Sequence, residues 1–169
     1  TIGVMLGIVI KLAGTVNPPP PPPAAPLFAS VVYGDIKVNP PGKPLLTEEE
    51  IKPKSTVKVG PASRMDLTTA RGGRLKIQSA MEIKVEKVYD NDTSVELTIT
   101  RGYCYASFVK KGEIVINYGK YTLKGSQVSF SLEDDSEGKY QVIVDAGRLA
   151  VTTDTGPQEI GQGDSLALP

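Results

Sequence analysis

Residues 27–169 predict an all-β domain of short antiparallel strands. Short runs of alternating apolar and polar residues recur every 8–12 positions or so, a spacing typical of sandwiches and barrels. Glycines fall between these runs, where tight turns require a positive φ. No window of about 11 residues carries the apolar stripe of an amphipathic helix. Together these observations indicate the fold class.

Alternation with a period of two justifies each expected strand. Leu75 and Ile77 share one face of segment 74–79, and the segment 81–88 keeps the pattern with one slip. The expected strands are 29–33, 36–38, 55–59, 64–69, 74–79, 81–88, 94–100, 103–109, 113–117, 120–123, 127–132, 140–145, 148–153 and 164–168. The residues that we expect to be mostly buried include Leu97, Ile99, Phe130, Val142, Val144 and Leu149.

One segment, residues 46–52, is a helix candidate. Thr47 is a suitable cap and Glu50 follows three residues later. The run Glu48-Glu49-Glu50 is equally typical of a solvated surface loop, which is the preferred interpretation.

The composition argues against an enzyme. The chain has no His, which removes the commonest general base and the commonest metal ligand. Cys104 alternates with two tyrosines, as a small core residue of a strand does. Lys plus Arg and Asp plus Glu number 19 each, so no net charge favours nucleic acid. We therefore expect no catalytic residue, no cofactor, no metal and no nucleic-acid partner.

Three features allow a functional hypothesis beside a plain structural one. The acidic segment 133–137 could hold calcium, but its spacing favours a solvated turn. The tyrosines of the second half could form a sugar- or partner-binding strip, but tyrosine is common in strands for packing reasons. Asn91 begins an N-glycosylation triplet, a pattern that also arises by chance. The tyrosines concerned are Tyr103, Tyr105, Tyr118, Tyr121 and Tyr140.

Residues 1–16 form a separate apolar segment. Its even positions are large aliphatic residues, which would line one face of an extended strand. These predicted assembly residues are Ile2, Val4, Leu6, Ile8, Ile10 and Leu12. Such a strand could complete the sheet of a neighbouring molecule. Alternatives are the clipped end of a membrane span, which would need about 20 apolar residues, and the tail of a signal peptide.

Residues 17–26 form a proline-rich linker. As polyproline II this linker would extend roughly 30 Å, which hinders residues 1–16 from folding back onto their own domain. A membrane tether would use the same stiff spacer. The consecutive prolines are Pro18, Pro19, Pro20, Pro21, Pro22 and Pro23.

Four ordered patterns in residues 27–169 resemble the FecR-like β domain. They are Gly73-Leu75-Ile77, Val95-Leu97-Ile99 with Gly102, Gly125-Ser126-Val128-Phe130, and Val142-Val144-Gly147-Leu149-Val151. The resemblance implies a small solenoid-like or sandwich-like domain outside the cytoplasmic membrane. Founding members of that family relay signals to a sigma factor. This sequence does not show the cytoplasmic N-terminal region that such signalling needs.

The preferred functional hypothesis is therefore structural. It describes a subunit of an extracellular or cell-surface pilus-like filament, whose partners are copies of itself and whose N-terminal strand inserts into the next subunit. The alternative is a membrane-anchored periplasmic FecR-like sensor or scaffold module. A third hypothesis is a carbohydrate- or ligand-binding envelope module.

Overall fold

The computed structural model describes residues 27–70, 72–78, 80–88, 95–134 and 139–168, and these residues form fifteen strands and no helix. The all-β prediction is confirmed. The strands are β1 (Leu27–Tyr33), β2 (Ile36–Asn39), β3 (Lys43–Pro44), β4 (Glu49–Ile51), β5 (Thr56–Val59), β6 (Arg64–Thr69), β7 (Arg74–Gln78), β8 (Met81–Val88), β9 (Val95–Ile99), β10 (Tyr103–Tyr118), β11 (Tyr121–Asp134), β12 (Tyr140–Ala146), β13 (Arg148–Thr153), β14 (Gly156–Gly161) and β15 (Ser165–Leu168).

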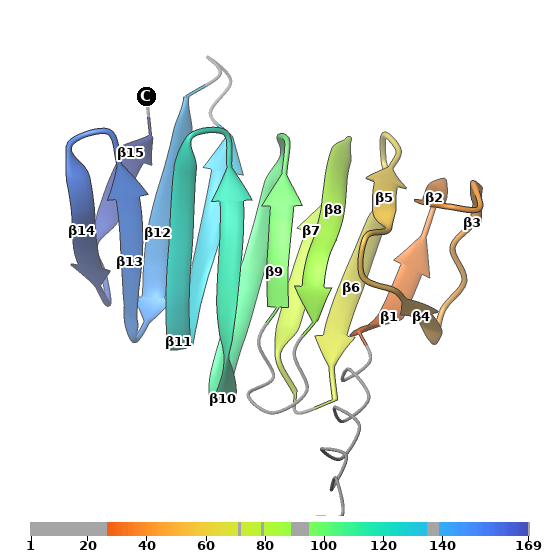
Figure 1. Cartoon of the computed structure of the whole chain (residues 1–169), viewed down its shortest axis with the longest axis horizontal. Coiled ribbons are helices and arrows are strands. Elements are labelled where there is room, and N and C mark those ends of the chain that lie inside the picture. Colours follow the sequence, from red (N-terminus) through yellow and green to blue (C-terminus); the bar gives the residue numbers. More distant parts are fainter. Residues whose placement is uncertain (1–26, 71, 79, 89–94, 135–138, 169) are drawn as a thin grey trace, which may run out of the picture.

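The strands form two layers that share the long strands β10 and β11 (Figure 1). The first layer has the order β4-β1-β6-β7-β10-β11-β12-β15. The second has the order β3-β2-β5-β8-β9-β10-β11-β13-β14. The pairs are antiparallel except β9 with β10, which is parallel. The hairpin of the two long strands therefore joins the layers near the middle of the molecule.

Each long strand contributes one half to each layer. In β10 the first half pairs with β7 and the second half with β9, and the register against β11 shifts between Phe108 and Glu113. Gly112 lies within this shift with a φ of 138°, a conformation that other residues rarely adopt. In β11 the first half pairs with β13 and the second half with β12. The breaks that the sequence suggested within 103–117 and 120–132 are therefore bends inside continuous strands.

One hydrophobic core lies between the two layers. It is lined by the inward residue of each alternating pair, because successive side chains of a strand point to opposite faces. The six residues expected in the core are each no more than 1% exposed, which confirms that prediction: Leu97, Ile99, Phe130, Val142, Val144 and Leu149. Burial of each such side chain stabilises the fold by about 1.5–3 kcal/mol.

The slip in the alternation of residues 81–88 is a β-bulge. Ile83 and Val85 point into the core, the register shifts between Val85 and Lys87, and Val88 is buried again. A bulge inserts one extra residue into one strand of a pair, so the inward face changes parity at that point.

The segment 46–52 is neither a helix nor entirely a loop, because Glu49–Ile51 forms β4 at the edge of the first layer. Ile51 is 1% exposed, and its burial fixes the segment against β1. The Glu49 carboxylate accepts a hydrogen bond from the Leu46 backbone N–H at 3.1 Å and forms an ion pair with Lys43 at 2.6 Å. These contacts lower the pKa of Glu49, the Lys43 hydrogen bond most.

Several predicted features lie outside the described residues. They are the apolar segment 1–16, the linker 17–26, the glycosylation triplet at Asn91 and most of the acidic segment 133–137. These predictions stay untested. Among the residues that are described, no helix is long and apolar enough to cross a membrane.

Candidate functional site

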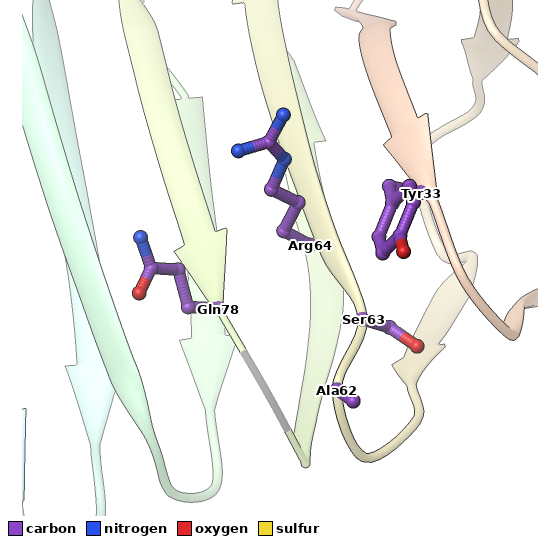
Figure 2. A pocket seen from close by; sticks show the side chains of 5 residues that line it. All are labelled: Tyr33, Ala62, Ser63, Arg64 and Gln78. Atoms are coloured by element: carbon purple, nitrogen blue, oxygen red, sulfur yellow. The ribbon is translucent and has the colours of Figure 1, made fainter.

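A pocket of about 490 Å³ opens at one end of the first layer, where β1, β6 and β7 lie side by side (Figure 2). Tyr33 is the last residue of β1, Arg64 the first of β6 and Gln78 the last of β7. Ala62 and Ser63, which precede β6, complete the lining. The pocket is therefore built from three strand ends and one loop.

Strand register places the three long side chains in one row. Tyr33 lies opposite Arg64, and Arg64 lies opposite Gln78. Neighbouring strands are about 4.8 Å apart, so the row crosses three strands within a short distance. Met65 and Ile77 point into the core, which directs Arg64 and Gln78 to the outer face.

Arg64 supplies a positive charge to this row. Its guanidinium carbon lies 5.9 Å from the centre of the Tyr33 ring, within the range of a cation–π interaction. Asp66 lies two residues further along the same strand, but its carboxylate is paired with Arg74 at 2.9 Å. Within the described part of the chain, no carboxylate forms an ion pair with Arg64. The guanidinium can therefore receive an external anion.

Ser63, the buried residue of the pocket lining, is held by hydrogen bonds to the backbone. The buried Ser63 hydroxyl accepts a hydrogen bond from the Asp35 N–H at 2.9 Å and donates one to the Pro61 carbonyl at 3.2 Å. The Gly60 N–H donates to the Asp35 carbonyl at 2.8 Å. These bonds tie the turn between β1 and β2 to the loop before β6, so the lining is preorganised.

Gly34 allows this turn to approach Ser63. Its φ is 91°, and a Cβ built on it would lie 2.3 Å from the Ser63 hydroxyl oxygen. A side chain at this position would therefore displace Ser63, which lines the pocket.

The tyrosines singled out from the sequence divide between the surface and the core. Tyr103 lies opposite Gln78 and continues the row, half-buried on the outer face. Burial, and next the charge of Glu133, raise the pKa of Tyr103. Tyr105 lies further along β10, and the amino group of Lys76 is 5.9 Å from its ring centre. Of the five tyrosines singled out from the sequence, only Tyr103 and Tyr105 can belong to an outer aromatic strip.

The remaining three tyrosines have packing roles. Tyr118 and Tyr121 are 5% and 6% exposed and belong to the core. Tyr140 packs against Tyr118 with ring centres 4.4 Å apart. For these three the structural interpretation holds.

Cys104 has the environment of an inert core residue. Its side chain is fully buried, and burial raises the pKa of its thiol to about 12. Thiolate is the nucleophilic form, so this cysteine is unreactive at neutral pH. Over the described residues, no group of three or more acidic or Cys side chains is placed to hold a metal ion.

Sequence reasoning did not identify Tyr33, Arg64 and Gln78 as a group. They are far apart in the chain, and only the pairing of β1 with β6 and of β6 with β7 brings them together. The one local signal was Tyr33 directly before the Gly34-Asp35 turn, which marks the end of a strand.

Comparison with known proteins gives a fold but no family. No family model and no curated protein matches the chain. Two crystal structures of a putative anti-sigma factor from Parabacteroides distasonis ATCC 8503 are similar, each with a TM-score of 0.54, at 11% and 12% identity. The similarity covers 67% of this chain and 58% of the Parabacteroides chains. The chain thus shares their fold over somewhat less than two thirds of their length.

The prediction of a pilus-like filament subunit is wrong, because the similar structures are those of a putative anti-sigma factor. The alternative hypothesis, a sensor or scaffold module, stays a proposal. The error has a physical origin in the six alternating aliphatic residues from Ile2 to Leu12. Alternation shows that a segment can form a strand with one apolar face, but it does not show what covers that face.

Proposed function

We propose that residues 27–168 form a FecR-like extracytoplasmic module of a membrane-anchored sensor or scaffold protein of the cell envelope. The observation that carries this proposal is the fold shared with the two structures of the putative anti-sigma factor from Parabacteroides distasonis. In this proposal the domain lies in the periplasm and presents its outer faces to signal-bearing partners. The two layers provide the rigid body, and the row of side chains at the end of β1, β6 and β7 provides an accessible surface.

Two glycines of the FecR-like patterns support the same proposal. Gly125 is buried in β11, with Val128 and Leu149 side-chain atoms 2.7 Å and 3.1 Å from where its Cβ would be. Gly147 forms the turn that carries the chain from β12 to β13. Gly125 and Gly147, two of the four glycines in these patterns, therefore occupy positions where a side chain would collide with the fold.

The experiment is an in-frame deletion of codons 27–168 in the source organism, followed by transcript profiling. We expect a small set of transcripts with a common promoter type to change, as for loss of a module that controls a sigma factor. A matched control replaces the exposed Gln162 with Ala and should leave these transcripts unchanged. Unchanged transcripts in the deletion strain, together with loss of a surface filament in electron micrographs, would overturn the proposal.

A further inference from the structure

We propose that the pocket of Tyr33, Arg64 and Gln78 binds a small polyhydroxylated ring that carries a carboxylate, the chemistry of a hexuronate sugar. This inference goes beyond the proposed function, which requires only an accessible surface for partners. It is argued from the chemistry of the pocket and is tested on the purified chain, so its outcome does not depend on the cellular role.

Arg64 determines the charge of the ligand. A guanidinium offers N–H donors in a planar fork that matches the two oxygens of a carboxylate. Of the acids that the structure describes, Asp66 shares the outer face of β6 but is already paired with Arg74. The Tyr33 ring at 5.9 Å limits the positions open to the guanidinium, so less conformational freedom is lost on binding.

Tyr33 determines the shape of the ligand. It is 65% exposed and is one of two large hydrophobic side chains this exposed among the described residues. An aromatic ring presents a flat apolar face, and its hydroxyl remains available for hydrogen bonding. A pyranose ring has a flat C–H face of this kind, whereas an inorganic anion has none.

Gln78 supplies the polar groups that a sugar requires. Its amide offers both a donor and an acceptor, which suits hydroxyl groups, since these also donate and accept. Figure 2 shows its side chain on the far side of Arg64 from Tyr33. A volume of about 490 Å³ lies within the usual range for small-molecule sites, about 300–1,000 Å³. A ring with one carboxylate and several hydroxyls is complementary to all three side chains.

The test is a titration of the full ¹⁵N-labelled chain with sodium glucuronate into the tens of millimolar, followed by amide chemical shifts. We expect saturable shifts centred on residues 33, 62–64 and 78. Glucose tests the carboxylate, and a blocked aspartyl dipeptide tests whether the carboxylate comes from a protein instead. Arg64→Gln should weaken glucuronate binding about tenfold or more, because it removes a charge-assisted bidentate contact.

A matched control is Arg148→Gln, which removes an exposed arginine of β13 that is paired with Glu159 and does not line the pocket. It should leave glucuronate affinity unchanged, and circular dichroism should show both variants folded. Three results would each overturn the proposal: glucose binding as tightly as glucuronate, the dipeptide binding while glucuronate does not, or no saturable shift with glucuronate at all. Equal weakening by Arg64→Gln and Arg148→Gln would likewise overturn the site, because it would indicate a general charge effect.

Discussion

Replacement of Gly147 by Ala tests the passage of the chain from the first layer to the second. Gly147 forms the turn between β12 and β13 with a φ of 80°. A Cβ at this position would lie 2.3 Å from the carbonyl oxygen of Gln127 and 3.1 Å from the Cα of Val128. Both atoms belong to the backbone of the β11 bend, so no side-chain rotation can relieve the contact.

Two costs add in this variant. A left-handed backbone conformation costs a residue with a Cβ about 1–2 kcal/mol, and overpacking against a fixed neighbour costs about 1–3 kcal/mol. We therefore expect Gly147→Ala to lower the free energy of unfolding by about 2–5 kcal/mol. Gly119→Ala is the matched control, because Gly119 has a φ of 54° and nothing within 4 Å of its Cβ position. It should incur the conformational cost alone.

Urea unfolding followed by far-ultraviolet circular dichroism and by tyrosine fluorescence measures both variants. The chain has seven tyrosines and no tryptophan, so tyrosine emission is directly observable. Midpoints should shift without a change in slope if only stability has changed. If Gly147→Ala and Gly119→Ala lose the same stability, the turn does not pack on the β11 bend and the description of the crossing is refuted.

Three further predictions concern the core and its charges. Val144→Asp should destabilise the domain by about 3–5 kcal/mol in urea unfolding, because it buries an unpaired carboxylate. Ala150 is exposed and lies opposite Lys124, so the control Ala150→Asp should be nearly neutral. Equal losses of stability in the two variants would contradict the strand register. Burial raises the pKa of the Cys104 thiol from 9.0 to about 12. As the pH rises, the unfolded state therefore loses this proton first, and the free energy of unfolding should fall from about pH 9 upward. Cys104→Ala should reduce this slope of stability against pH. An unchanged slope would contradict the burial. The pKa of Glu86 is lowered, mainly by the Lys84 hydrogen bond, so the contribution of the Glu86 carboxylate to folding stability should disappear as the pH falls below 4.5. At neutral pH, Glu86→Gln should lower the stability measured by thermal unfolding by less than about 1 kcal/mol. A larger loss would contradict a surface ion pair.

The sequence predicted the strands and the core because alternation is a local property. An inward residue such as Ile99 or Val144 is identified by its immediate neighbours, whatever strand lies beside it. The bulge after Val85 was also visible locally, as a slip in the alternation.

The arrangement of the strands could not be predicted in the same way. The pattern around Gly112 is compatible with a hairpin turn or with a bend in a continuous strand, and only pairing with β7 and β9 decides between them. Residues 49–51 have a polar sequence that suggests a loop, yet pairing with β1 makes them a strand. Tertiary pairing overrides local preference in such cases.

The candidate site depended on the same non-local information. Tyr33, Arg64 and Gln78 come from three strands, and a register change of one residue between two of them would turn a side chain to the opposite face. The filament hypothesis instead drew on residues 1–26, which lie outside the described part of the chain.

The proposal that this domain works outside the cytoplasmic membrane is tested most directly by thiol labelling in cells. Cys104 is fully buried, so it should not react, whereas Leu46 is 65% exposed and Leu46→Cys should react readily. The variant gene product is treated with a membrane-impermeant maleimide in cells whose outer membrane alone has been permeabilised, beside the parent protein. Labelling of the Leu46→Cys protein above the parent before lysis is the expected result. Labelling that appears only after the cytoplasmic membrane is broken would contradict the proposed function.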